Sequence, residues 1–104
     1  MLLQGKKAII TGGTRGIGFS VAEVFLKNGA SVALFGSRQE TVDKALAQLK
    51  SENPAWEVIG MAPDLTDYAA LDAAFSEVEN RFGRIDILVN NAGISAREPL
   101  YEYT

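Results

Sequence analysis

The chain has 104 residues, of which 47% are hydrophobic and 22% are charged, so we predict one globular domain or part of one. Its net charge of −3 does not indicate binding to nucleic acid or to an anionic membrane, and no apolar run reaches the roughly 20 residues that span a bilayer. The absence of cysteine and histidine excludes disulfides and thiolate chemistry, and it removes the commonest general base and metal ligand.

The first third of the chain predicts a strand, a helix and a second strand. The stretch 7–11 is short, rich in β-branched residues and bounded by glycines, which is typical of a buried strand. After Gly16, apolar side chains recur at i, i+4, i+7 and i+8, which places them on one face of a helix. The sequence KNG at 27–29 is typical of a helix end, and residues 31–35 predict the second strand.

A second helix is expected to begin at a capping box. In the sequence SRQE, Ser37 would take the N-cap position and Glu40 the N3 position. Apolar residues at helical spacing follow. The helix is expected to end at Asn53, because the residue before a proline is disfavoured in the helical conformation.

The rest of the chain continues the alternation. Residues 57–61 predict a third strand, and residues 64–67 have turn and capping chemistry. A further apolar helical face closes at Gly83, and residues 85–89 predict a fourth strand. Pro99 suits the first turn of one more helix.

This β-α-β-α-β-α-β order predicts an α/β fold with a Rossmann-like, doubly wound parallel sheet, present as its N-terminal half. We treat residues 1–104 as the dinucleotide-binding N-terminal portion of a single domain. The fourth strand would lie at an edge, although it is apolar enough to be buried. A missing partner is therefore expected, either more chain or another subunit.

The sequence TGGTRGIG, residues 11–18, joins the first strand to the first helix. Backbone N–H groups of such a turn attract an anion, and glycines allow a tight turn, a close pyrophosphate and close helix packing. A P-loop is excluded because Phe19 stands where lysine is required, and G-x-G-x-x-G fails at Val21. The remaining pattern, T-G-x-x-x-G-x-G, indicates a dinucleotide site; the alternative is a tight strand-to-helix turn.

Together with LVNNAG at 88–93, this motif resembles the short-chain dehydrogenase/reductase family, from Lys6 to about Ile94. Within the family, the chain is most similar to bacterial 3-oxoacyl-acyl-carrier-protein reductases and to related hydroxysteroid and polyol dehydrogenases. The resemblance implies that the catalytic and substrate-binding portion is absent from the chain.

The resemblance also implies roles for individual residues. Asp64, which is followed by Leu65, matches the acidic residue that hydrogen-bonds the adenine amino group in the family. An aspartate at this position is equally typical of a turn or a helix N-cap. Asn90 begins the turn where the family places the adenosine ribose, and a plain turn is the alternative. The candidate cofactor-binding residues are Gly12, Thr14, Arg15, Gly16, Ile17, Gly18, Ser37, Arg38, Asp64, Leu65, Asn90, Ala92 and Gly93.

Two arginines favour NADP over NAD. An acid about 20 residues past the glycines marks NAD, whereas a nearby arginine suits the 2′-phosphate of NADP. That count from Gly18 reaches Arg38, and no acid ends the second strand. Arg15 adds a second guanidinium, and in the resembling reductases the arginine at its position binds this phosphate. Ser37 would add a hydroxyl donor, unless it only caps the helix, and both arginines could instead be surface charges.

No catalytic residue is assigned in this chain. The family uses a tyrosine and a lysine four residues apart, plus a serine. The residue four after Tyr68 is Asp72, and Tyr101 and Tyr103 lie too near the end of the sequence for such a partner. The resemblance places the pair beyond position 104, and the polar residues at 95–101 are interpreted as loop residues.

The expected parent protein is an NADPH-dependent enzyme that moves a hydride between nicotinamide and a carbonyl or secondary alcohol carbon. A 3-oxoacyl thioester is the leading substrate class, and a hydroxysteroid or polyol is the alternative. A non-catalytic dinucleotide-binding fragment is the second hypothesis. The resemblance implies a homo-oligomer, a tetramer if full length, and we expect a cytoplasmic protein with no bound metal and no nucleic-acid or membrane partner.

Overall fold

Strands and helices alternate along the chain, as the sequence predicts. The computed structural model describes residues 2–12, 14, 16–64 and 66–90 and the backbone of 101–102. The elements are β1 (Lys7–Thr11), α1 (Gly16–Lys27), β2 (Ser31–Phe35), α2 (Gln39–Glu52), β3 (Val58–Met61), α3 (Tyr68–Phe82), β4 (Ile87–Asn90) and β5 (Tyr101–Glu102). The sheet order is β3-β2-β1-β4-β5, with β1 to β4 parallel. The predicted doubly wound α/β class is confirmed.

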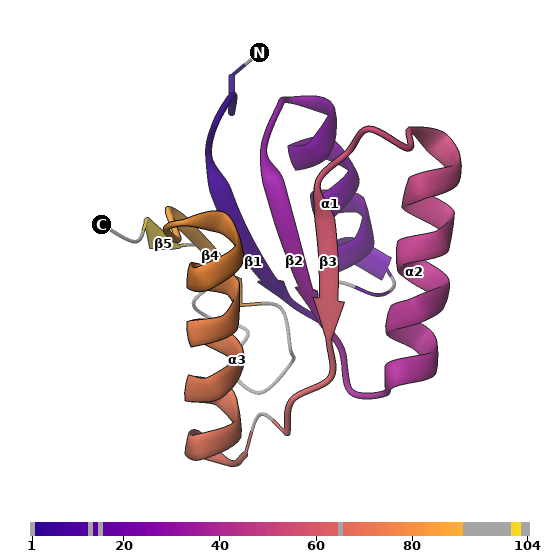
Figure 1. The fold of residues 1–104 in the computed structure, drawn as a ribbon. Coiled ribbons are helices and arrows are strands. Elements are labelled where there is room, and N and C mark those ends of the chain that lie inside the picture. The colour runs from indigo at the N-terminus through magenta and orange to yellow at the C-terminus, as the bar shows by residue number, and fades with distance from the viewer. Residues whose placement is uncertain (1, 13, 15, 65, 91–100, 103–104) are drawn as a thin grey trace.

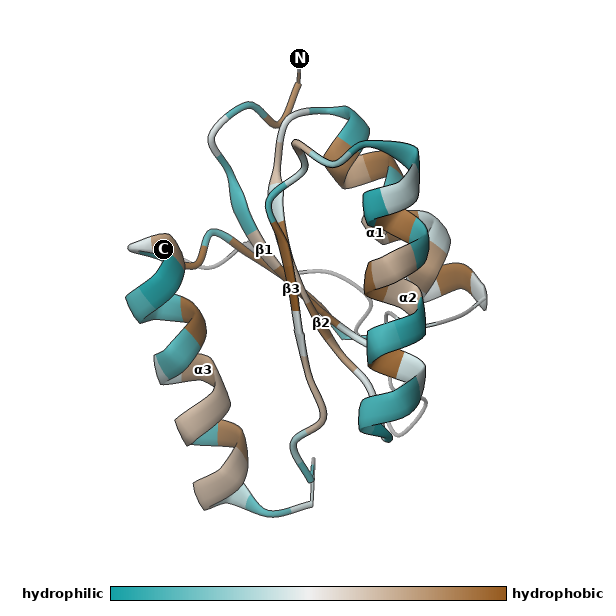
Figure 2. Ribbon diagram, turned by 45° about the vertical axis from the view of Figure 1, so that its right-hand side comes forward, coloured by the Kyte–Doolittle hydropathy of each residue, from teal (hydrophilic) through white to brown (hydrophobic). Residues whose placement is uncertain are grey.

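Helices cover both faces of the sheet, with α1 and α2 on one side and α3 on the other (Figure 1). Successive side chains of a strand point to opposite faces, so Ala8 and Ile10 pack with α1 and α2 while Ile9 packs with α3. All three are fully buried. The strands are accordingly apolar along most of their length (Figure 2), which is the pattern of a parallel sheet buried on both faces.

The two ends of α3 match the sequence prediction. Asp67 is the N-cap, and its Oδ1 accepts hydrogen bonds from the Ala69 and Ala70 N–H groups at 3.0 and 3.3 Å. Gly83 ends the helix at φ 87°, in the left-handed region that favours glycine. The three helices of the described residues have 12, 14 and 15 residues, and none of them could span a bilayer.

The predicted capping box of α2 is wrong, because the helix begins one residue later than expected. Arg38 is the N-cap, with φ −137° and ψ 136°, and Ser37 lies outside the helix. The Gly36 N–H donates to Met61 O at 3.0 Å, which extends the β2–β3 pairing beyond β2. The chain therefore stays extended through Arg38, whose carbonyl accepts the first helical hydrogen bond from Val42 at 3.1 Å.

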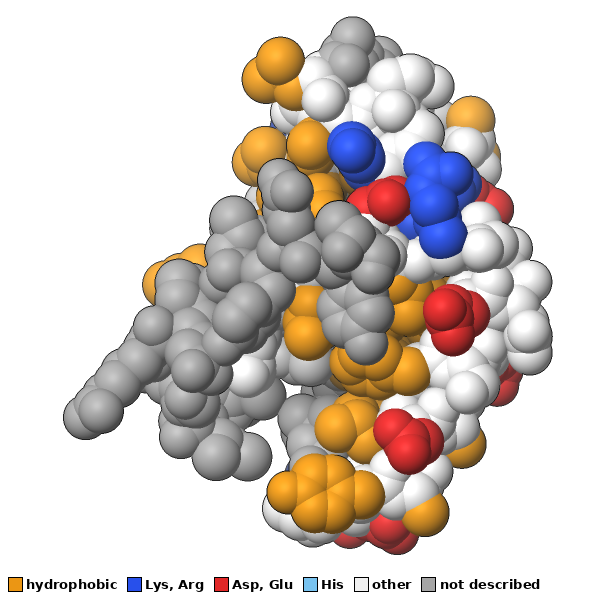
Figure 3. All heavy atoms as spheres, turned by 90° about the vertical axis from the view of Figure 1, so that its left-hand side faces the viewer, with side chains coloured by type: hydrophobic (Ala, Val, Ile, Leu, Met, Phe, Trp, Pro, Cys, Tyr) orange, Lys and Arg blue, Asp and Glu red, His pale blue; other side chains and the backbone are white. Residues whose placement is uncertain are grey.

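The edge beside β4 also differs from the prediction. Tyr101 and Glu102 form the short strand β5, antiparallel to β4, where a helix was expected; Pro99 lies outside the described residues. The unpaired N–H and C=O groups of a strand edge favour such pairing. Ile87 and Leu88 remain half-buried, so β4 is less covered than β1 and β2. Figure 3 views this side and shows hydrophobic side chains at the surface in the middle of the face.

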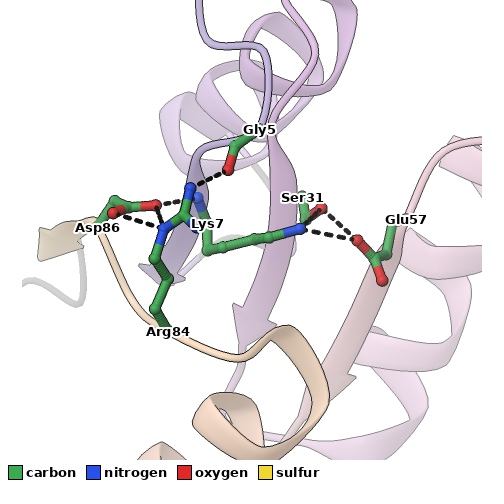
Figure 4. Close-up of polar contacts among 6 residues, drawn as sticks. All are labelled: Gly5, Lys7, Ser31, Glu57, Arg84 and Asp86. Carbon is green, nitrogen blue, oxygen red and sulfur yellow. Dashed lines mark hydrogen bonds and ion pairs between the residues drawn. The ribbon is translucent and has the colours of Figure 1, made fainter.

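A polar network ties the amino ends of the strands together (Figure 4). The Lys7 N–H donates to Asp86 at 2.9 Å, and Arg84 Nε donates to both oxygens of the same carboxylate at 2.9 and 3.0 Å. Lys7 Nζ donates to Ser31 Oγ at 3.1 Å and lies 3.4 Å from Glu57, which also accepts from the Ser31 hydroxyl. The hydrogen bond from Ser31 lowers the pKa of Glu57 against the effect of burial, and Lys7 assists.

Asp86 is expected to make stability depend on pH. Burial raises the pKa of Asp86, but the Lys7 N–H and the hydrogen bonds and charge of Arg84 outweigh it, so the pKa is lowered. A carboxyl group with a lowered folded-state pKa stabilises the fold above the unfolded value of about 4, and this contribution is lost as the pH falls through the folded-state pKa. We expect Asp86→Asn to reduce the free energy of unfolding at pH 7 by about 1–2 kcal/mol.

Urea unfolding of wild type and Asp86→Asn at pH 7 and at decreasing pH below about 4 checks this expectation. The difference between the two proteins should shrink toward low pH. Asp72→Asn, at an exposed position on α3, is the control and should show little difference at any pH. A difference for Asp86→Asn that stays constant with pH would contradict the assigned role of its charge.

Candidate functional site

The predicted site residues that the structure describes lie at the carboxyl edge of the sheet. The chain runs from β1 to β2 and β3 on one side of β1 and then returns to β4 on its other side. The direction in which strands are added to the sheet therefore reverses between β1 and β4. In open α/β sheets, ligands bind in the crevice at such a switch point, outside the carboxyl ends of the strands. The arrowheads of β1, β2 and β3 mark this edge in Figure 1.

The glycine turn after β1 has the backbone that its sequence predicts. Gly12 (φ 68°) and Gly16 (φ 61°) are both left-handed, a conformation that side chains disfavour. The Gly12 N–H donates to Phe35 O at 2.7 Å, which fixes the turn against the end of β2. Gly18 lies on the buried face of α1, where it allows close packing against the sheet. Ile17 is 75% exposed beside it.

The loop after β2 packs directly against the glycine turn. Gly36 is buried, and a Cβ atom there would lie 2.6 Å from Thr14 Cγ2 and 2.8 Å from Val42 Cγ2. Any side chain at position 36 would therefore displace the Thr14 and Val42 side chains. Gly36 was not among the predicted site residues, although a glycine in or beside a strand often marks a close approach by another part of the chain. This contact brings residues 37–38 to the same edge as Thr14.

Ser37 and Arg38 are both exposed at this edge. The Arg38 side chain makes no capping hydrogen bond to α2. Its Nη1 lies 3.4 Å from Glu40 Oε1, in the first turn of the helix. The first N–H groups of a helix lack intrahelical partners and attract anions, so an anion beside Arg38 would meet both a guanidinium and a helix N-terminus.

Asp64 lies in the loop after β3 and is an ionised acceptor. Its Oδ1 accepts hydrogen bonds from Thr66 Oγ1 at 2.7 Å and from the Thr66 N–H at 2.9 Å. These two bonds lower the pKa of Asp64, so it is charged at neutral pH. The side chain is exposed. It can therefore accept a hydrogen bond from an external amino group, as the family resemblance implies.

Asn90 and Thr11 form a pair across the switch point. They lie opposite each other at the carboxyl ends of β4 and β1. Thr11 is buried at 6% exposure, and its hydroxyl donates toward Asn90 Oδ1 at 3.1 Å and Val89 O at 3.3 Å. Because the Asn90 amide oxygen accepts the hydrogen bond from Thr11, the orientation of the Asn90 side chain is fixed. Thr11 was not among the predicted site residues, because as the last residue of β1 its sequence signal is that of a strand.

Four of the predicted residues lie outside the described part of the chain, namely Arg15, Leu65, Ala92 and Gly93. Their roles stay predictions. A surface hollow of about 530 Å³ adjoins the glycine turn at Gly16 and Ile17 and continues along α1 to Val24 and Phe25. It lies on the flank of the helix rather than over the pair of Thr11 and Asn90.

The sheet order and the glycine turn define a class of protein: a doubly wound α/β domain with a left-handed glycine turn at its switch point. The chain belongs to the short-chain dehydrogenase family, whose sequence profile matches residues 6–104. This agrees with the resemblance that its two motifs indicate.

Known members cover the chain almost completely. It is 54% identical over 103 residues to a 3alpha-hydroxysteroid dehydrogenase of Mediterraneibacter gnavus, covering 99% of this chain and 41% of that protein. It is 40% identical over 104 residues to a sorbitol dehydrogenase of Cereibacter sphaeroides, covering 100% of this chain and 39% of that protein. The chain thus spans about two fifths of the length of these relatives.

A solved structure has the same fold. L-sorbose reductase from Gluconobacter frateurii, complexed with NADPH and L-sorbose, superimposes with a TM-score of 0.80 at 38% identity. The match covers 88% of this chain and 34% of the reductase.

Proposed function

We propose that the protein to which this chain belongs is an NADPH-dependent oxidoreductase acting on a carbonyl or secondary alcohol carbon. The observation that carries the proposal is the glycine turn, with left-handed Gly12 and Gly16 at the β1–β4 switch point of a short-chain dehydrogenase chain. The NADPH bound to the similar L-sorbose reductase supports the choice of cofactor.

The described residues fit a dinucleotide. The glycine turn is free of side chains at Gly12 and Gly16, and it leads into the N-terminus of α1, so it can take the pyrophosphate. Asp64 would accept from the adenine amino group, and Asn90 would lie against the adenosine ribose. Arg38, with Ser37 and the predicted Arg15, would bind the 2′-phosphate, since guanidinium groups make bidentate bonds to phosphate.

The nicotinamide, when bound, supplies or accepts the hydride. The residues of this chain would bind and orient the adenosine half of the cofactor. The tyrosine and lysine that move the hydroxyl proton in this family are expected beyond position 104, so their roles are not assigned to any residue here.

The names of the relatives favour a hydroxysteroid or polyol as substrate. The identity to the hydroxysteroid dehydrogenase is 54%, against 40% to the sorbitol dehydrogenase, so we propose a hydroxysteroid and its ketone first. A 3-oxoacyl thioester, the leading class on the motifs alone, stays a prediction. We further propose a cytoplasmic homo-oligomer.

Oxidation of NADPH by the full-length protein tests the proposal. We expect the NADPH absorbance to fall when a 3-oxosteroid is added, and to fall more slowly with a ketose or a 3-oxoacyl thioester. The control is the same mixture with no carbonyl compound. If the protein binds NADPH but oxidises it with none of these three carbonyl compounds, the result would support the non-catalytic alternative.

A further inference from the structure

Arg38 pairs with a carboxylate in the first turn of the helix that it caps. Arg38 Nη1 and Glu40 Oε1 lie 3.4 Å apart, and the two side chains are 67% and 76% exposed. Exposed pairs of this kind contribute little to stability and exchange readily with other ions. Arg38 is thus held by an acid that an incoming anion can displace.

Glu40 offsets an unfavourable charge at the start of α2. A helix N-terminus carries a partial positive charge, so an arginine at the N-cap is repelled and an acid in the first turn is attracted. Glu40 is the acidic residue of that turn, and Arg38 makes no capping bond. In the free protein, Glu40 therefore supplies the negative charge that a phosphate would supply beside Arg38.

We infer that Glu40 is a specificity-determining residue, because it competes with the 2′-phosphate of NADPH for Arg38 and so lowers the preference for NADPH over NADH. This inference rests on the proposed function. Competition weakens binding of the cofactor with the extra phosphate, whereas NADH does not need Arg38. Glu40 thus limits NADPH affinity without itself touching the nicotinamide.

Equilibrium binding of NADPH and of NADH to the Glu40→Gln variant tests the inference, with intrinsic fluorescence or calorimetry as the readout. We expect NADPH to bind about twofold to fivefold more tightly, the range that exposed ion pairs contribute, and NADH to bind as before. The matched control is Asp43→Asn, which removes the same charge from the same helix. Asp43 accepts from Gln39 Nε2 at 2.9 Å rather than from Arg38, so this variant should change neither affinity appreciably.

Glu40→Gln and Asp43→Asn are also measured in an Arg38→Ala background. This comparison separates competition between Glu40 and the 2′-phosphate for Arg38 from general repulsion between Glu40 and the cofactor phosphates. If Glu40 acts through Arg38, Glu40→Gln should have no effect on NADPH binding once Arg38 is absent. An equal gain in both backgrounds, or no gain in the wild-type background, overturns the inference. If the wild-type protein binds NADH as tightly as NADPH, the proposed cofactor is wrong, which is a separate failure.

Discussion

Arg38→Ala is expected to weaken NADPH binding by about 10- to 100-fold and to leave NADH binding within about twofold. Hydrogen bonds to charged groups are each worth about 1.5–3 kcal/mol, and Arg38 is placed at the edge that also carries Thr14 and the glycine turn. NADH has no 2′-phosphate, so it loses nothing when this guanidinium is removed. Arg15→Ala should show the same selectivity. Equilibrium titration with each cofactor measures both effects.

Two further variants sharpen this test. Arg38→Lys keeps the charge but loses the planar fork, so it should recover only part of the NADPH affinity. Arg81→Ala removes an arginine from α3, where it pairs with Glu77 at 3.0 Å, and should change neither affinity. Equal losses of NADPH and NADH on Arg38→Ala would contradict the assignment of the 2′-phosphate to this residue.

Gly36→Ala is expected to weaken binding of both cofactors by about tenfold or more and to lower the free energy of unfolding by about 1–3 kcal/mol. The added Cβ would lie 2.6 Å from Thr14 Cγ2 and 2.8 Å from Val42 Cγ2, closer than carbon atoms can approach. Either the Thr14 and Val42 side chains or the backbone segments that carry them must shift. Because the pyrophosphate and the adenosine ribose depend on this edge, NADH binding should fall together with NADPH binding.

A second substitution tests the steric cause. Thr14→Ser removes the Cγ2 methyl group and keeps the hydroxyl, so it should restore part of the affinity lost in Gly36→Ala. Gly60→Ala is the matched control, because a Cβ at Gly60 would meet Val42 and Leu46 but not Thr14. Gly60→Ala should therefore lower stability without rescue by Thr14→Ser. No recovery in the Gly36→Ala, Thr14→Ser double variant would contradict a direct contact between the two loops.

The regular elements were predictable because their signals are local. The apolar spacing and the ends of α1 and α3 follow from neighbouring residues, including the Asp67 cap and the left-handed Gly83. The parallel order also follows from the strand and helix alternation. The glycine turn was predictable because close approach of the backbone requires glycine at particular positions, two of which are left-handed here.

The features that the sequence did not predict depend on contacts between residues far apart in the chain. The start of α2 depends on the Gly36 N–H bond to Met61, which no local capping pattern contains. The roles of Thr11 and Gly36 likewise depend on Asn90 and Thr14, which belong to other loops or strands. The antiparallel β5 depends on the open edge of β4 rather than on the sequence around Pro99.

A crystal structure of the protein with bound NADPH tests the central claim most directly. We expect the pyrophosphate at the N-terminus of α1, beside Gly12 and Gly16, and the 2′-phosphate within hydrogen-bond distance of Arg38. The adenine amino group should face Asp64. A cofactor bound away from the carboxyl edge of β1 and β4, or a 2′-phosphate pointing away from Arg38 into solvent, would contradict the account.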